Sequence, residues 1–277
     1  MSQYAYPEVL VDTQWLNDRL SDPNIRLIEV GINPQVYNEG HIPNAVFWNA
    51  IADLLLPDFR INFDAAAVEK LLARSGITKD TTIVTASTDY PATGAMLFWL
   101  LKVFGHDDVR VLNGSRQKWI AEGRPLTTEI LTITPTGYYV SAPNESLRAF
   151  CDDVQQAIAS FDRVLVDVRT PQEYSGECFM THPPKGDERA GHIPGAIHVP
   201  YELTLNEDGT FKSVEELQAL YQDKGITPDK QIITYCAIGG RSGYTWFVLK
   251  YLLGYPNVRN YDGSWNEWSR SNLPIEK

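Results

Sequence analysis

One short stretch of the chain places a cysteine, two adjacent glycines and an arginine between a strand-like run and a helix-like run. An apolar, β-prone run ends at Tyr235, Cys236 follows, and an apolar helical pattern begins soon afterwards. Gly239 and Gly240 allow the positive φ angles that turn successive backbone N–H groups inward toward an anion. Because Arg241 adds a positive charge, the stretch predicts a cysteine thiolate held in an anion-binding loop.

The predicted nucleophile is Cys236, since a helix N-terminus and a nearby arginine both lower the pKa of a thiol. The carboxyl end of a parallel strand is also where open α/β sheets bind their ligands. The residues predicted to bind the substrate are Ala237, Ile238, Gly239, Gly240, Arg241 and Ser242. The opposing interpretation is a buried cysteine without chemistry, because free cysteines are often buried. Such a cysteine needs neither the glycine pair nor the arginine.

The chain contains an internal repeat. Residues 76–119 align with residues 225–268 at a constant offset of 149, and 15 of the 44 pairs are identical, where average composition gives about 3 by chance. The sequence Gly-His-Ile-Pro also occurs twice, at residues 40–43 and 191–194. The counterpart of the cysteine in the first copy is Ser87, which has neither a glycine pair nor an arginine after it. Only the second copy therefore carries the predicted chemistry.

Strand-like and helix-like segments alternate in each copy, the pattern of a mainly parallel sheet flanked by helices. In the second copy the predicted strands are residues 164–168, 197–199, 232–235 and 258–261, and the predicted helices are residues 214–224 and 242–253. We predict an α/β protein with domains at residues 1–124 and 146–277, joined by a linker at 125–145 that is rich in Pro and Thr. Residues 175–190 have no first-copy counterpart of similar length and are predicted to form a long functional loop.

The composition excludes several classes of function. A net charge of -11 and a pI near 4.9 argue against binding to nucleic acids or to anionic membranes. No apolar run reaches the length of a membrane span, and no secretory signal is readable. Three cysteines, an odd number without an export signal, favour reduced thiols and a cytoplasmic protein.

Four motifs together make the chain resemble the tandem rhodanese family, over residues 10–268. They are Asp167-Val168-Arg169, Glu173-Tyr174, the Gly-His-Ile-Pro-Gly-Ala turn at 191–196 and the six-residue loop at 236–241. The resemblance implies two rhodanese-like domains, of which the N-terminal one is catalytically inactive and the C-terminal one is active, with a site near their interface. It also implies that Cys236 takes the outer sulfur of thiosulfate as a persulfide. A ping-pong mechanism without metal or organic cofactor then passes this sulfur to cyanide or a thiol.

The chain departs from the family pattern at the substrate contacts. Its loop is similar to that of bacterial thiosulfate enzymes ending in Arg-Ser, which favours thiosulfate over 3-mercaptopyruvate as the donor. Relatives carry a substrate-binding arginine where this chain has Glu173. Because a carboxylate repels an anionic donor, Arg241 is the expected cationic contact, with Arg189 as the weaker candidate.

The remaining candidates lie behind or beside the loop. Asp167 and Arg169 are predicted to form a buried ion pair that braces the loop, and Glu173 is placed with them behind the site. The histidines of both Gly-His-Ile-Pro turns and the tryptophans near residue 268 are predicted to be structural. Cys178, in the long loop, is a candidate resolving thiol that would take sulfur from Cys236.

Two other functions stay open at this point. Cell-cycle phosphatases share the rhodanese fold, but they place five residues between their cysteine and arginine, and here only four separate Cys236 from Arg241. The second alternative is a persulfide carrier that serves one acceptor protein, in place of an enzyme with a small-molecule donor and acceptor. Turnover with small donors and acceptors would separate the two.

Overall fold

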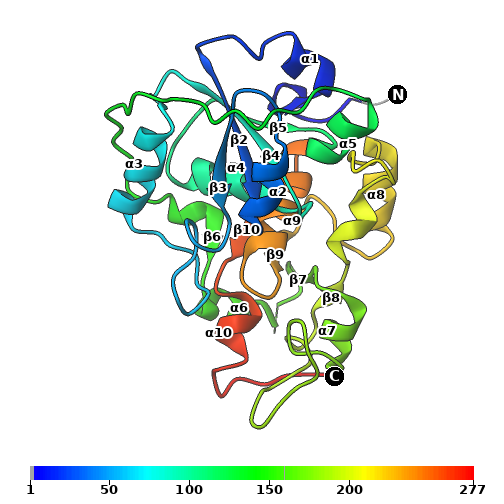
Figure 1. The fold of residues 1–277 in the computed structure, drawn as a ribbon. Helices are drawn as coiled ribbons and strands as arrows, with labels where there is room; N and C mark the ends of the chain where they lie inside the picture. Colours follow the sequence, from blue (N-terminus) through cyan, green and yellow to red (C-terminus); the bar gives the residue numbers. More distant parts are fainter. Residues whose placement is uncertain (1–2, 159) are drawn as a thin grey trace.

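The computed structural model describes residues 3–158 and 160–277 and contains two copies of one α/β unit (Figure 1). The first sheet has the strand order β1-β5-β4-β2-β3 and the second the order β6-β10-β9-β7-β8, and all strand pairs are parallel. The strands of the first sheet are β1 (Leu10–Val11), β2 (Ile25–Gly31), β3 (Ala45–Asn49), β4 (Thr82–Ser87) and β5 (Val109–Leu112). Those of the second are β6 (Arg148–Ala149), β7 (Arg163–Asp167), β8 (Ile197–His198), β9 (Gln231–Tyr235) and β10 (Val258–Tyr261). The predicted α/β class and duplication are confirmed.

The helices of the first copy are α1 (Thr13–Asn17), α2 (Pro34–Glu39), α3 (Ala65–Arg74), α4 (Thr93–Val103) and α5 (Ser115–Ala121), with η1 (Pro7–Val9) before them. Those of the second are η2 (Glu145–Leu147), α6 (Cys151–Ile158), α7 (Pro171–Ser175), η3 (Tyr201–Thr204), α8 (Val214–Gln222), α9 (Gly240–Phe247) and α10 (Ser264–Trp268). The helix predicted at residues 242–253 is α9 continued by a π-helical segment, η4 (Val248–Leu252). Within the described residues, no helix has the length and apolarity needed to cross a membrane.

Strand β9 positions the predicted nucleophile. Its residues after Gln231 are all buried, as expected for a strand covered on both faces of its sheet. Ile232 and Ile233 are β-branched side chains that fit such a strand. β9 lies between β7 and β10, so Cys236 leaves the sheet at its centre, where neighbouring strands hold the backbone on both sides.

The two copies share one apolar interface. Helices α4 and α9 pack against each other near the centre of the molecule (Figure 1). The rings of Phe98 and Phe247 meet there edge to face, with centroids 4.8 Å apart. The N-terminal segment also reaches the second copy, because the Ala5 N–H donates to the Leu252 carbonyl over 2.9 Å. The core therefore continues from one copy into the other.

The segment predicted as a linker runs over the first copy. The Thr136 N–H donates to the Ala73 carbonyl at 3.0 Å, and Thr127 pairs with His41 in an antiparallel bridge. The Tyr138 side chain is buried and contacts His106, with its hydroxyl 2.7 Å from the ring nitrogen. These contacts show why a sequence rich in Pro and Thr is ordered here without forming helix or strand.

Both Gly-His-Ile-Pro turns use their histidine in the same way. His41 stacks on Tyr37 with ring centroids 3.8 Å apart, and its Nδ1 lies 3.0 Å from the Tyr37 carbonyl. His192 stacks on Tyr174 at 3.7 Å, with its Nδ1 2.9 Å from the Tyr174 carbonyl. Each histidine is buried and ties the turn to the preceding helix.

The carbonyl that opens each turn is held by an arginine, but from different elements. In the second copy, Arg169 after β7 donates to the Gly191 carbonyl at 2.7 Å. In the first copy, Arg116 of α5 donates to the Gly40 carbonyl at 2.6 Å. The two copies thus reach the same contact by different substitutions.

Glu29 gives the fold a predicted pH dependence. Its carboxylate is buried and accepts the Ile42 N–H at 2.7 Å. Burial raises the pKa of Glu29 from 4.5 to about 7, despite this hydrogen bond and the charge of Arg116. A raised folded-state pKa means that stability is lost as pH rises from about 4.5 through 7. We expect Glu29→Gln to gain free energy of unfolding relative to the native protein over this range, measured by urea unfolding at pH 4 to 8. A stability difference that does not change with pH would contradict this expectation.

Candidate active site

Cys236 lies at the bottom of a tight loop between β9 and α9. The residue is 1% exposed, and its Sγ accepts the Gly239 N–H at 3.2 Å and the Ser242 hydroxyl at 3.5 Å. Both donors come from the loop and from the first turn of α9, so they point at the position where a thiolate or a persulfide carries its charge. The structure thus brings Gly239 and Ser242, two of the predicted loop residues, onto the sulfur.

The N-terminus of α10 fixes the loop from behind. The Cys236 N–H donates to the Ser264 hydroxyl at 3.1 Å. In return, the Trp265 N–H donates to the Cys236 carbonyl at 3.0 Å and the Asn266 N–H to the Ala237 carbonyl at 2.8 Å. These three bonds hold the backbone of Cys236 and Ala237 without involving the sulfur.

Gly239 cannot be replaced without moving the loop. Its φ is +89°, a conformation that side chains disfavour. A Cβ at this position would lie 2.7 Å from the Asp262 carbonyl oxygen and 2.9 Å from Ile61. The glycine is thus required both for backbone conformation and for space, and its amide is the one that donates to the sulfur.

The Cys236 thiol has a lowered pKa in this site. Burial alone would raise its pKa, but the charge of Arg241 and the hydrogen bonds from Ser242 and from the Ile238 backbone outweigh burial. The pKa of Cys236 is therefore lowered below the usual value for a thiol. A lowered pKa means a larger thiolate fraction near neutral pH, as a nucleophilic cysteine requires.

Arg241 lines the cavity over Cys236 but is already paired with a carboxylate. Its guanidinium forms a two-pronged ion pair with Glu173, with both N–O distances 2.7 Å. Burial opposes ionisation of Glu173, yet the Arg241 guanidinium holds the pKa of this carboxyl below its usual range. Glu173 also caps α7, because it accepts the Thr170 N–H at 3.0 Å. Arg241, the expected cationic contact for the donor, is therefore paired with Glu173, the carboxylate whose charge it was expected to offset.

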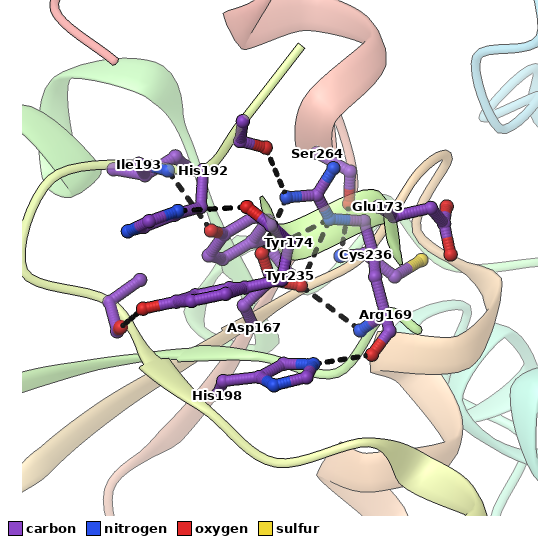
Figure 2. Close-up of polar contacts among 12 residues, drawn as sticks. Asp167, Arg169, Glu173, Tyr174, His192, Ile193, His198, Tyr235, Cys236 and Ser264 are labelled. Carbon is purple, nitrogen blue, oxygen red and sulfur yellow. Dashed lines mark hydrogen bonds and ion pairs between the residues drawn. The ribbon is translucent and has the colours of Figure 1, made fainter. Parts of the chain in front are cut away.

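Asp167 and Arg169 form a buried ion pair beside the cysteine. Their closest N–O distance is 2.6 Å, and both side chains are at most 1% exposed. Arg169 also lies over the Trp265 ring, 4.6 Å from its centroid. Figure 2 shows this network on one side of Cys236, with the sulfur pointing away from it. The pair thus braces β7 and the base of α10 without touching the reactive atom.

A cavity of about 570 Å³ opens over the cysteine between the two copies. The second copy contributes Cys236, most of the loop after it, Glu173, and Met180 and Thr181 from the long loop at residues 175–190. The first copy contributes mainly apolar side chains: Ile32, Ile51, Leu55, Phe59, Tyr90 and Met96. This volume suits an organic ligand, which commonly occupies 300 to 1,000 Å³.

Among the predicted residues that do not line this cavity, Arg189 and Cys178 also make no hydrogen bond to the loop around Cys236 in the part of the chain that the structure describes. The Arg189 guanidinium donates to the carbonyls of Ser271 and Leu273 near the C-terminus, so it does not supply a positive charge to the site. Cys178 does not line the cavity, although Met180 two residues later does. All three cysteines are free thiols. Within the described residues, no group of three or more His, Cys, Asp or Glu side chains is arranged to hold a metal ion.

Sequence reasoning missed Ser264 and the whole first-copy wall of the cavity. A signal for Ser264 was present, since Asn113-Gly114-Ser115 aligns with Asp262-Gly263-Ser264. Ser115 makes the equivalent bond, accepting the Ser87 N–H at 3.0 Å. No local signal marks the wall residues, because their role depends on how the two copies pack.

A duplicated parallel-sheet domain with one donor-lined cysteine loop where the copies meet fits a protein that transfers a group through a thiol. The family model of the rhodanese-like domain matches the chain twice, over residues 12–122 and 150–271. The chain therefore belongs to the rhodanese family and carries the family's domain in tandem.

Known proteins of similar sequence cover almost the whole chain. "Sulfur carrier protein TtuD" of Thermus thermophilus is 49% identical over 282 residues, which span 99% of this chain and 98% of that protein. A Mycolicibacterium smegmatis protein named "Putative thiosulfate sulfurtransferase" is 44% identical over 275 residues, spanning 98% and 99%. A solved structure of the anaerobic ergothioneine biosynthesis enzyme from Chlorobium limicola, in complex with trimethyl histidine, has a TM-score of 0.87 at 27% identity. That similarity covers 100% of this chain and 72% of the enzyme. Family and relatives place this chain among the sulfurtransferases.

Proposed function

We propose that this protein moves the outer sulfur of thiosulfate to a thiophilic acceptor through a persulfide on Cys236. The thiolate attacks the outer sulfur, the S–S bond of thiosulfate breaks, and its electron pair leaves with sulfite. The N–H of Gly239 and the hydroxyl of Ser242 stabilise the negative charge at the cysteine. Residues 146–277 act as the catalytic domain, and residues 1–124 supply one wall of the cavity.

The second half-reaction returns the cysteine to its starting state. Cyanide or a thiolate attacks the terminal sulfur of the persulfide, the S–S bond breaks, and the electron pair returns to the Cys236 sulfur. Donor and acceptor therefore react in turn with one nucleophile, which is a ping-pong scheme. Asp167 and Arg169 position the loop and take no part in bond making.

One observation carries this proposal. The Cys236 sulfur, with a lowered pKa, accepts hydrogen bonds from the loop and lines a cavity large enough for a second substrate. The buried-cysteine interpretation accounts for none of these features. The phosphatase alternative is disfavoured, since only four residues separate Cys236 from Arg241 and this arginine is paired with Glu173.

The test is the persulfide itself. The reduced protein is incubated with thiosulfate, the donor is removed, and intact mass and peptide mapping locate any added sulfur. We expect one added sulfur atom on Cys236, with Cys151 and Cys178 as internal controls. Loading by 3-mercaptopyruvate alone would keep the persulfide chemistry and change the donor, whereas no loading from either would overturn the proposed function.

A carrier function is the second candidate, and the name of the Thermus thermophilus relative supports it. As a carrier, the protein would hold the same persulfide but release it only to one acceptor protein. Measuring turnover with cyanide or small thiols separates the two, because a dedicated carrier shows little. Cys178 stays a candidate resolving thiol, and unchanged thiol-dependent turnover in Cys178→Ser would exclude it.

Glu173 is predicted to weaken thiosulfate binding. Glu173→Gln keeps the capping geometry of α7, since glutamine also serves at this position, but frees the charge of Arg241. A freed guanidinium can make a charge-assisted contact with the dianion, so we expect the KM for thiosulfate to fall about tenfold. Glu202→Gln, which removes a charge at the cavity without contacting Arg241, is the matched control. A higher KM in Glu173→Gln would show that the ion pair itself holds Arg241 in a binding position.

A further inference from the structure

Phe59 has a positive φ, and the corresponding residue of the second copy is a glycine, Gly209. The hairpin at residues 55–61 is closed by the Leu56 N–H on the Arg60 carbonyl at 2.8 Å, and the Phe59 N–H donates to the Leu56 carbonyl at 2.9 Å. In the second copy, the hairpin at residues 205–211 has the same two bonds, with Gly209 in the place of Phe59. Phe59 has φ +65° and Gly209 has φ +79°.

A bulky side chain at positive φ is strained, and glycine is the residue that such hairpin loops favour. The backbone therefore does not explain the phenylalanine, so its side chain must. That side chain is 45% exposed and lines the cavity over Cys236, beside Ile32 and Ile51, which are 44% and 36% exposed. Strained residues with unexplained side chains are typical of ligand contacts.

The hairpin is held against the catalytic loop. The Asn266 side-chain amide donates to the Asp58 carbonyl at 2.9 Å, and Asn266 belongs to the same α10 that fixes the Cys236 loop. The position of Phe59 relative to the sulfur is thus set by a direct contact between the copies. This contact joins an apolar wall of the cavity to the element that fixes the Cys236 loop.

The charges of the cavity oppose an anionic ligand. Among the described residues that line it, the charged side chains are Glu173, Arg241 and Glu202. Glu173 and Arg241 pair with each other, so the two carboxylates and one guanidinium at the cavity leave a net negative charge there. A ligand with a carboxylate would lose its hydration here without gaining an unpaired cation.

From these observations we propose that Phe59 recognises the sulfur acceptor, and that this acceptor is an organic thiol with an apolar body and no negative charge. The inference rests on the proposed function, because it concerns the second half-reaction. The acceptor thiolate attacks the terminal sulfur of the Cys236 persulfide, the S–S bond breaks, and the electron pair returns to Cys236. The product is the acceptor's own persulfide, and no oxidant or reductant is consumed.

The test is the transfer of sulfur from preloaded protein to a series of straight-chain alkyl thiols, whose intrinsic reactivity changes little with length. Each added methylene buried against the apolar wall is expected to raise the second-order rate constant about fourfold. 3-Mercaptopropionate, similar in size to butanethiol, is expected to react about tenfold or more slowly than butanethiol. A flat length series, or equal rates for the anionic and the neutral thiol, would overturn the proposal.

Phe59→Gly separates recognition from folding, since glycine relieves the backbone at this position. We expect Phe59→Gly to retain its thermal stability. Its second-order rate constant should become nearly independent of the length of the alkyl thiol. Phe59→Asn is a second variant, because asparagine also tolerates positive φ. Asn44→Gly is the matched control, with φ +65° and a glycine counterpart, Gly195, but no place in the cavity. An unchanged length series in both Phe59 variants would show that the phenylalanine does not contact the acceptor.

The two proposals fail in different ways. If Cys236 takes up no sulfur from thiosulfate or 3-mercaptopyruvate, the proposed function fails before any acceptor is added. If Cys236 loads normally but alkyl thiols of different length react alike, only the assignment of Phe59 fails.

Discussion

Replacing Cys236 by serine is expected to reduce turnover with thiosulfate and cyanide by about 10⁴-fold or more and to abolish sulfur loading. A serine hydroxyl stays protonated near neutral pH, and it cannot form a persulfide. The substitution is nearly isosteric, and the loop is held by backbone bonds to α10 that do not involve the sulfur. The fold should therefore be retained, which circular dichroism and thermal unfolding can check.

Cys151→Ser and Cys178→Ser are the matched controls for this experiment. Both cysteines lie outside the cavity, so each variant should load one sulfur and turn over thiosulfate and cyanide as the native protein does, because the role considered for Cys178 concerns thiol acceptors alone. Significant turnover in Cys236→Ser, or loss of loading in either control, would move the chemistry away from Cys236.

Replacing Arg241 by glutamine is expected to lower turnover at pH 7 by about 10- to 100-fold. Burial favours the neutral thiol, and the charge of Arg241 is the largest of the effects that lower the pKa of Cys236. Without this charge the pKa rises, so the thiolate fraction at a given pH falls. The acid limb of the pH dependence of kcat/KM should move to higher pH, and activity should recover as pH is raised.

A double variant separates this electrostatic effect from misfolding. Arg241→Gln alone leaves the Glu173 carboxylate buried without its partner, which is expected to destabilise the fold. In Arg241→Gln/Glu173→Gln that charge is also removed, so thermal stability should return while the pH profile stays shifted. An acid limb at the native position in both variants would show that Arg241 does not control the thiol.

The sequence made the catalytic loop predictable because all its determinants are local. About twenty consecutive residues encode the strand before Cys236, the glycine pair after it and the helix that follows. The internal repeat marks the same strand and helix in both copies. Parallel strands buried on both faces also have an apolar composition that identifies them directly. For these reasons the four strands predicted in the second copy agree with the structure to within one residue at each end.

The pairing of Glu173 with Arg241 was beyond such reasoning. The sequence Thr170-Pro171-Gln172-Glu173 is a recognisable capping box, so the place of the carboxylate at the start of α7 was readable. Its partner lies 68 residues away on another element. Contacts of this kind depend on how two strands and their following helices are spaced, which local patterns do not specify.

The cavity wall was unreadable for the same reason on a larger scale. Phe59 stands about 180 residues before Cys236, and its neighbours in the sequence suggest only a turn. Comparison of the two copies could have revealed it, because a phenylalanine replaces a glycine within an otherwise matching hairpin. Arg189 shows the opposite case. From the sequence its guanidinium seemed available to bind the donor, but in the structure it donates to carbonyls near the C-terminus.

The exchange of Arg116 for Arg169 at the two turns has a consequence for the modularity of the duplicated unit. In each copy a different arginine donates to the first carbonyl of the Gly-His-Ile-Pro turn. The residue before the stacked tyrosine also differs, since it is Val36 in the first copy and Glu173 in the second. If the loop at residues 236–241 replaced its counterpart in the first copy, its arginine would find Val36 at the position where Glu173 pairs with Arg241. The two copies have therefore diverged around the same turn, and both line the one cavity that opens over Cys236.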